Sequence, residues 1–199
     1  TQNSPVDHGA RKVLSMLVSD LTHFLDMPEE APGPAQRLGR HFADIVRAAT
    51  AANCVSEQWT SALPCRRRPG HRACSGRIAI AAGPPSTPIR WCCTACGDEG
   101  IITNWEGSPY DLRPKKLVAV GGAAREIVVS EEVATALRDL FFLDPNAERR
   151  VFAMTAYPRG AAPHASTADL EELSEAVAAE ANHEPNRRRQ RRLDDAFDA

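Results

Sequence analysis

The cysteines of this chain are concentrated in one stretch. Five of the six lie between Cys65 and Cys96, and the clearest chemical pattern among them is Cys93-Thr-Ala-Cys96, followed by Gly97. A spacing of two residues lets both thiolates point to one side of a tight turn, and a glycine relieves the backbone after the second cysteine. Thiolates presented in pairs by such turns are typical ligands of structural zinc. The stretch therefore predicts a metal site.

Two ligand sets are compatible with the spacing. The favoured set consists of four cysteines: Cys65, Cys74, Cys93 and Cys96. The alternative set replaces Cys65 by His71, which restores a short His-x-x-Cys spacing to Cys74. We favour the four thiolates because they are the commoner ligands of closed structural sites, and because Pro-Gly at 69 and 70 allows the longer loop to turn back.

The stretch from about residue 64 to residue 105 resembles the zinc-ribbon group, in which two Cys-x-x-Cys turns at the ends of β-hairpins clamp one zinc ion. The match rests on the turn at 93–97 and on strand-like segments at 76–82, 89–93 and 100–105. The first turn departs from the ribbon pattern, because residues 66–73 separate its two cysteines. The resemblance implies a structural Zn²⁺ in a small β module, and strands this short cannot bury enough surface to fold alone.

Other chemistry for these thiols has less support in the sequence. A redox dithiol needs its cysteine pair at the N-terminus of a helix, and the segment after Cys96 has no helical pattern. A catalytic zinc needs an open coordination position and a nearby base, for which Asp98 and Glu99 are the neighbours. No deaminase signature of the His-x-Glu type accompanies the cysteines. A metal-dependent enzyme with its site around Cys93, Cys96 and Glu99 is therefore the rival hypothesis.

Arginines crowd the loop between the first two candidate ligands: Arg66, Arg67, Arg68 and Arg72. A loop held by metal would present them as a fixed cationic surface, and the planar guanidinium fork suits phosphate oxygens. The formal net charge of −2 argues against a chain that coats nucleic acid through its overall charge. We therefore expect a local contact with an acidic partner, DNA or RNA being the candidates, and the competing interpretation is a solvated or internally paired basic surface.

The segments on either side of this stretch predict helices and short strands. Apolar residues at spacings of three and four predict helices over 11–26 and 35–52, joined by a proline-rich turn, and so a helical hairpin. Residues 125–129 and 150–157 favour strands, with a turn at 143–147 between them.

The C-terminal part of the chain also contains signals for the starts of helices. Ser130 is a candidate N-cap with two glutamates after it, and Ser166 or Thr167 is the candidate N-cap of a later helix. A short return strand is expected near 162–165, and an arginine-rich final helix follows Asn186.

These patterns predict an α+β protein with an N-terminal helical hairpin, a central zinc-ribbon-like β module and a C-terminal strand-helix-strand-strand-helix unit. The expected boundaries are 1–56 for the hairpin, 57–113 for the zinc-ribbon-like module, 114–124 for a linker and 125–199 for the C-terminal unit. We interpret the chain as a zinc-binding regulatory or adaptor protein, not an enzyme. A protein–protein interaction or homodimeric module that does not bind nucleic acid is the alternative.

The cellular location is predicted from what the sequence lacks. No stretch approaches the roughly 20 apolar residues that a membrane-spanning helix needs. The N-terminus has no basic segment followed by an apolar one, so no signal peptide is expected. A Cys-x-x-Cys pattern without an export signal favours metal chemistry over disulfides, and we expect a cytoplasmic protein without membrane contact.

Overall fold

A computed structural model of the chain describes residues 16–28, 30–51, 58–84, 86–113 and 125–198. The mixed α+β class is confirmed, with a helix in the N-terminal part and helices at the C-terminus. The linker expected over 114–124 lies outside the described residues.

A seven-stranded sheet in the order β1-β5-β4-β3-β2-β7-β8 forms the centre of the structure. β1 pairs with β5 in parallel, whereas the other pairs in this sheet are antiparallel. The strands are β1 (Leu17–Asp20), β2 (Trp59–Pro64), β3 (Arg77–Ala81), β4 (Ile89–Cys93), β5 (Glu99–Thr103), β7 (Thr155–Tyr157) and β8 (Gly160–Ala162). A separate antiparallel pair consists of β6 (Arg125–Glu126) and β9 (His164–Ala165).

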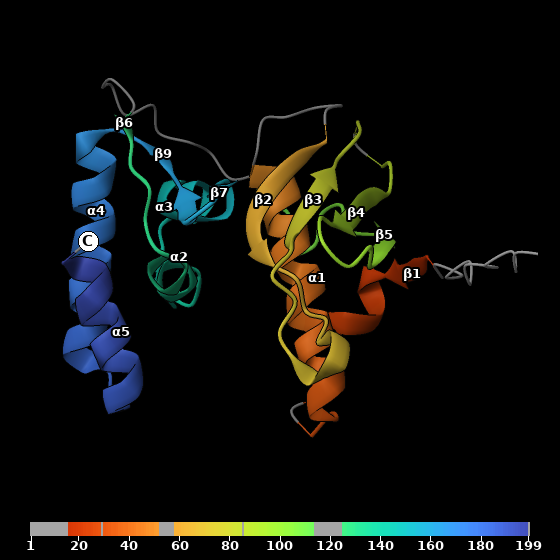
Figure 1. Ribbon diagram of the computed structural model, residues 1–199, viewed down its shortest axis with the longest axis horizontal. Coiled ribbons are helices and arrows are strands. Elements are labelled where there is room, and N and C mark those ends of the chain that lie inside the picture. Colours follow the sequence, from red (N-terminus) through yellow and green to blue (C-terminus); the bar gives the residue numbers. More distant parts are fainter. Residues whose placement is uncertain (1–15, 29, 52–57, 85, 114–124, 199) are drawn as a thin grey trace, which may run out of the picture.

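One helix packs on the middle strands of this sheet, and the other helices lie on the side of β7 (Figure 1). The long helix α1 (Gly33–Ala51) lies against β2, β3 and β4. The remaining helices follow β6 along the chain and pack on one another: α2 (Glu131–Arg138), α3 (Pro145–Phe152), α4 (Thr167–His183) and α5 (Arg187–Phe197). In Figure 1, α2 and α3 lie between the sheet and the pair formed by α4 and α5.

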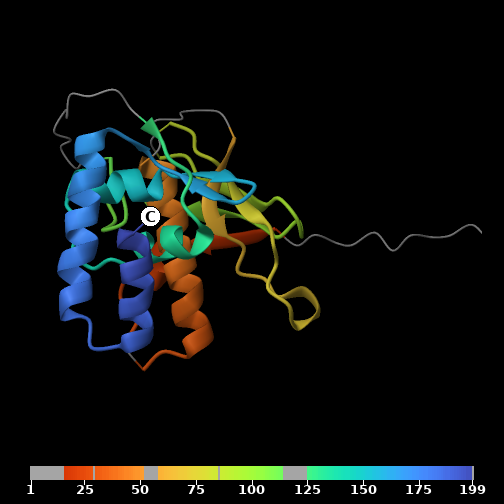
Figure 2. The ribbon, with the colours of Figure 1, turned by 60° about the vertical axis from the view of Figure 1, so that its left-hand side comes forward.

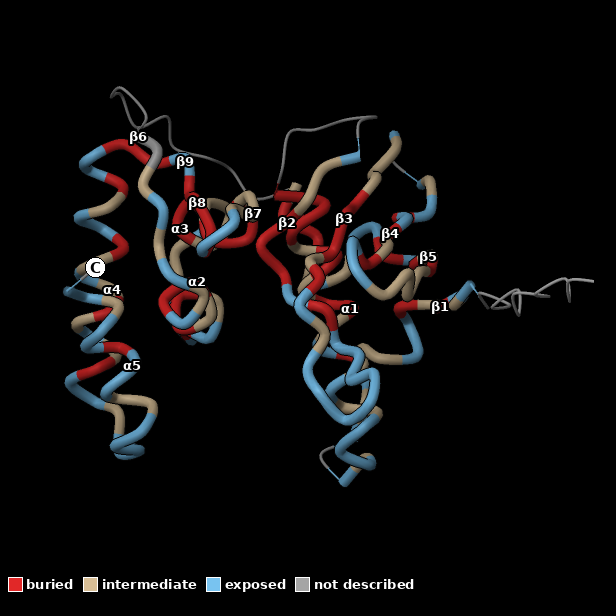
Figure 3. The backbone as a smooth tube through the Cα atoms, viewed as in Figure 1, coloured by how far each residue is buried: buried red, intermediate tan, exposed pale blue. Residues whose placement is uncertain are grey.

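The hydrophobic core consists of two clusters, and both α1 and β2 contribute residues to each of them. One cluster lies between α1 and the sheet, and its fully buried side chains include Phe42, Ile45, Ile78, Ile80, Ile89 and Ile102. The other cluster lies among α2, α3, α4 and α5, and includes Met154, Val151, Val177 and Leu193. Figure 3 shows the buried residues in red along α1, β2 and β3 and in the C-terminal helices.

The prediction of a helix over 11–26, the first of the expected N-terminal hairpin, is wrong for the residues that the structure describes. Leu17–Asp20 is the strand β1, which pairs in register with Gly100–Thr103 of β5. The Asp20 carboxylate accepts a hydrogen bond from the Thr22 backbone amide at 2.9 Å, and a 3₁₀ turn, η1 (Leu21–Phe24), follows. Leu21 is fully buried, whereas Met16 and Val18 are exposed, so only part of the expected apolar face reaches the core. The second expected helix, over 35–52, is confirmed as α1.

The strand expected over 150–157 is also wrong in its first half, as is the turn expected at 143–147. Helix α3 occupies Pro145–Phe152, and the strand β7 begins only at Thr155. The Asp144 carboxylate accepts hydrogen bonds from the amides of Asn146 and Ala147, at 2.7 Å for Asn146. An aspartate before a proline is a strong helix start, because the carboxylate accepts from amides of the first turn and the proline itself has no amide hydrogen to satisfy.

Other expected elements are confirmed. The strands expected around the cysteines appear as β3, β4 and β5. Ser130 caps α2 through a hydrogen bond from the Val133 amide at 3.2 Å. Ser166 caps α4, and its hydroxyl and the Asp169 carboxylate form a reciprocal capping box.

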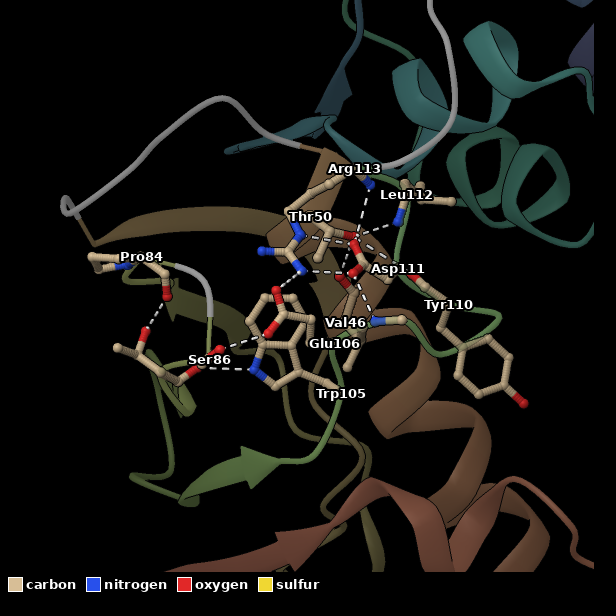
Figure 4. A network of polar contacts seen from close by, with 12 residues as sticks. Val46, Thr50, Pro84, Ser86, Trp105, Glu106, Tyr110, Asp111, Leu112 and Arg113 are labelled. Carbon is tan, nitrogen blue, oxygen red and sulfur yellow. Dashed lines mark hydrogen bonds and ion pairs between the residues drawn. The ribbon is translucent and has the colours of Figure 1, made fainter.

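The sheet joins the residues of the expected central module to those of the expected C-terminal unit. β2 pairs with β7 at Ser61 and Thr155, and the buried Ser61 hydroxyl donates to the Ile78 carbonyl at 2.7 Å. A polar network then holds the chain that follows β5 (Figure 4). The buried Asp111 carboxylate accepts from the Arg113 guanidinium at 2.7 Å, and the Leu112 amide donates to the Thr50 hydroxyl at the end of α1 at 3.0 Å.

Candidate metal centre

Four cysteines from two β-hairpin regions meet at one point of the structure. Cys65 follows β2 and Cys74 precedes β3, while Cys93 ends β4 and Cys96 lies in the turn before β5. Their Sγ atoms all lie within 4.8 Å of one another, and the four form the potential metal-binding cluster found among the described residues. Two cysteines from each of two turns is consistent with a zinc-ribbon-like site.

The sulfur–sulfur distances fit a tetrahedral metal ion. The Sγ atoms of Cys65 and Cys96 are 3.7 Å apart, and those of Cys74 and Cys93 are also 3.7 Å apart. A tetrahedron with zinc–sulfur bonds of about 2.3 Å has edges of about 3.8 Å. A disulfide bond would instead place the two sulfurs about 2.05 Å apart, so these four thiols are free.

Backbone amides point at the sulfurs. The donors are the amides of Arg67 to Cys65, of Gly76 to Cys74, and of Ala95 and Cys96 to Cys93, at 3.4 Å to 3.5 Å from the sulfur atoms. Such bonds favour the negatively charged form of a thiol. Burial, and then the neighbouring thiols, raise the pKa of Cys65, against the effect of the Arg67 amide. A bound divalent cation would supply the positive charge that a group of adjacent thiolates requires.

Gly76 allows the two turns to approach closely. A Cβ atom on this residue would collide with the Cys93 sulfur and would lie 2.8 Å from the Cβ of Ala95. Gly97, after the second cysteine of the other turn, has a positive φ of 69°. Close packing therefore favours glycine at position 76, and the backbone conformation favours glycine at position 97.

The hydrogen bonds around Cys74 explain the unusual spacing of the first turn. The Cys74 amide donates to the Arg67 carbonyl at 3.0 Å, and the Cys65 amide donates to the Gly76 carbonyl at 3.0 Å. The loop formed by residues 68–73 therefore leaves the turn at Arg67 and returns beside it. Without these residues, Arg67 would be followed by Cys74 and the spacing would be Cys-x-x-Cys. The first turn is thus a two-residue cysteine turn with an insertion.

His71 lies in this inserted loop and outside the cysteine cluster. It is exposed, ends the short 3₁₀ turn η2 (Pro69–His71), and has a positive φ of 65°. Among the described residues, the cluster of four potential metal ligands contains Cys65 and does not contain His71.

The four arginines of the loop fall into two groups. The guanidinium groups of Arg66 and Arg67 lie 3.4 Å and 3.7 Å from the carboxylate oxygens of Asp98, which is only 14% exposed. Arg68 and Arg72 are exposed and take part in no ion pair among the residues that the structure describes. In Figure 2 the loop between β2 and β3, drawn in gold, projects from the body of the protein. The pairing with Asp98 was missed in the sequence, although Asp98 lies directly after the second cysteine turn.

Glu99 lies on the other face of the sheet. It pairs with Cys92 in the β4–β5 register, and both residues line a hollow of about 320 Å³ together with Ala79, Ala81 and Arg90. Cys92 accepts a hydrogen bond from the Gln58 side chain at 3.6 Å, and burial raises the pKa of its thiol. Because successive residues of a strand point to opposite faces, Glu99 does not face the cluster that contains Cys93.

Comparison of the chain with protein-family models, with curated proteins and with solved structures found no match. No helix in the described part of the chain is long and apolar enough to cross a membrane. Inferences about function therefore depend on the cysteine cluster and the arginine loop.

Proposed function

We propose that Cys65, Cys74, Cys93 and Cys96 bind one structural zinc ion. The observation that carries this proposal is the pair of 3.7 Å sulfur–sulfur distances, which are close to the edge of a zinc–thiolate tetrahedron. Four protein ligands fill a tetrahedral site and leave no open position for a substrate. Of the two candidate bases, Glu99 lies on the opposite face and the Asp98 carboxylate is paired with Arg66 and Arg67, so a structural role is better supported than catalysis.

Metal analysis of the protein purified under reducing conditions tests this proposal. We expect about one zinc ion per chain, as in other four-cysteine sites, and a tetrahedral thiolate absorption spectrum after replacement with Co²⁺. Cys93→Ser should abolish stoichiometric binding, whereas Cys92→Ser, which changes the neighbouring residue on the other face, should retain it. Reduced protein that contains no zinc and takes up no Co²⁺ would refute a metal site.

The chain then acts as a zinc-binding regulatory or adaptor protein whose arginine loop binds an acidic partner, and nucleic acid is the partner that we propose. Arg68 and Arg72 support this proposal because they are exposed and form no ion pair within the described part of the chain. Arg67 is 59% exposed despite its contact with Asp98, and exposed ion pairs of this kind are weak enough to exchange for a phosphate. Arginine is well suited to such contacts because its fork binds two oxygens at once.

Salt dependence of DNA and RNA binding tests the arginine loop. Each phosphate contact contributes about 0.9 to the slope of log affinity against log salt, so Arg68→Ala with Arg72→Ala should lower that slope by about two. Arg159→Ala is the matched control, because Arg159 is an exposed arginine in the turn between β7 and β8. Affinity that is unaffected by both salt and the double substitution would exclude the loop as the contact.

A further inference from the structure

The strands around the metal centre share a hydrophobic core that extends well beyond the four cysteines, although Cys65 and Cys93 belong to the same cluster. Ile78 and Ile80 of β3, Ile89 of β4 and Ile102 of β5 are all 0% exposed and belong to the cluster that packs on α1. Each fully buried side chain of this size contributes about 1.5–3 kcal/mol. The short strands expected to need a metal are therefore part of a larger sheet with its own core.

The loop that carries the arginines has no such support. None of the residues of η2 is buried, and Gly70 and His71 both have positive φ angles, 59° and 65°. Within the loop, the His71 amide donates to Arg68 and the Arg72 amide to Pro69, at 3.2 Å and 3.3 Å. The loop is thus held mainly at its ends, by the cysteine turn from which it leaves and by the ion pairs of Arg66 and Arg67 with Asp98.

We propose that metal occupancy of the four-cysteine site switches the binding of the acidic partner on and off while the fold remains intact. The loop leaves the chain at Arg67 and returns at Cys74, so both of its ends are held by residues of the metal site. Without the ion, the two cysteine turns are held together only by hydrogen bonds, by packing against the cluster beside α1, and by the ion pairs of Arg66 and Arg67 with Asp98. The loop arginines then lose their fixed position, and a partner must order them at a cost in affinity.

The two parts of the molecule then have separate roles. The sheet, α1 and the C-terminal helices form the scaffold, and the metal positions a contact surface on it. This inference rests on the proposed function, since it concerns the same loop and the same partner. It goes further in that it makes binding a response to metal availability.

The experiment compares three proteins, with a labelled DNA duplex as the probe. They are the zinc-loaded chain, the same chain after chelation under reducing conditions, and a zinc-loaded variant that lacks residues 68–73. The chelated chain should retain its far-ultraviolet circular dichroism and a cooperative unfolding transition, yet bind the duplex about tenfold or more weakly, because two long side chains are no longer pre-ordered. Added Zn²⁺ should restore the affinity.

The deletion variant separates the loop from the metal. It joins Arg67 to Cys74 as Cys-x-x-Cys, so it should retain zinc and fold but bind the duplex as weakly as the chelated chain, with or without metal. The double variant Arg68→Ala with Arg72→Ala should likewise bind the duplex weakly, and its affinity should not change when the metal is removed. If the chelated chain binds as well as the loaded one, or if it loses its circular dichroism, metal-gated binding is wrong although the nucleic-acid proposal stands. If the zinc-loaded chain does not bind nucleic acid, both are wrong.

Discussion

At the scale of single residues, the metal centre depends on small side chains as much as on its ligands. The two cysteine turns approach so closely at Gly76 that a methyl group would collide with the Cys93 sulfur. The amide of the same residue donates to the Cys74 sulfur at 3.4 Å. A single substitution at this position therefore tests the geometry without removing a ligand.

We expect Gly76→Ala to weaken metal binding by about 10–100-fold, the range observed when groups that support metal ligands are changed. The physical reason is that the added Cβ must displace the Cys93 sulfur or the neighbouring turn. Competition for Co²⁺ or Zn²⁺ with a chelator measures the effect. Ser75→Ala, in the exposed residue before it, is the control and should change the affinity little. Equal affinities for the two variants would contradict the proposed close approach.

His41 on α1 provides a test by pH. Its ring packs edge-on against Trp91, with centroids 5.7 Å apart, and burial, assisted by the charge of Arg66, lowers the pKa of His41 to about 4. The unfolded chain takes up this proton near the ordinary pKa of about 6.5, so it binds more protons than the folded chain below that pH. The contribution of His41 to stability is therefore complete above pH 6.5 and is lost as the pH falls towards 4.

Between pH 7.5 and 4.5 this effect should lower the free energy of unfolding of the natural chain by about 2 kcal/mol more than that of His41→Gln. Urea unfolding at both pH values measures the difference. The comparison cancels the contributions of the thiols and carboxylates, which are common to both chains. A natural chain and variant with parallel pH dependence would show that His41 is not held neutral.

At the scale of elements, three helix starts in the C-terminal part were predicted from a capping residue, and a fourth was missed. Ser130 and Ser166 are the observed caps, and the final helix begins after Asn186 as expected. Asp144 was missed because Asp-Pro was interpreted as a turn and the β-favouring Val151 and Phe152 as a strand. In the structure these two residues are helical and are buried against other helices. Such packing overrides β propensity and cannot be inferred from the local sequence.

The choice between Ser166 and Thr167 as the cap of α4 has a direct test. The Ser166 hydroxyl accepts from the Asp169 amide and donates to its carboxylate, and Ser166 is 5% exposed. Ser166→Ala should therefore reduce stability by about 1–2 kcal/mol. Thr167→Ala, in the exposed next residue, should change the stability by less than about 0.5 kcal/mol. Thermal or denaturant unfolding of the two variants measures both values, and the reverse order would contradict the assignment.

At the scale of the whole molecule, the continuity of the sheet is the feature that sequence patterns did not reveal. Residue composition predicts short strands, but it does not predict which strands pair. The pairs β2–β7 and β1–β5 join segments far apart in the chain. Cys93 and Cys96 were identified from their local spacing. Cys65 was favoured over His71 from ligand type, and the cluster of sulfur atoms places it beside them. The hydrogen bond between Cys74 and Arg67 adds the reason for its long spacing, which local patterns could not supply.

Because β2 belongs to both hydrophobic clusters, we expect the zinc-loaded chain to unfold in one cooperative transition. Tryptophan fluorescence reports on the cluster beside α1, because Trp91 and Trp105 belong to it and Trp59 packs against it, whereas far-ultraviolet circular dichroism is dominated by all of the helices. The two signals should change at the same denaturant concentration, as two-state behaviour requires. Two separate midpoints would instead support independent folding of the expected central and C-terminal units.

The parallel pairing of β1 with β5 has a consequence for the order in which the protein forms during synthesis. β3, β4 and β5 are sequential neighbours that can pair as hairpins as soon as they leave the ribosome, whereas Leu17 must wait for Gly100. Until then Leu17–Asp20 has no strand to pair with, although the adjacent η1 can already pack on α1. The N-terminal strand is thus made early but docks late, and the nascent chain has to keep it from pairing elsewhere for that interval.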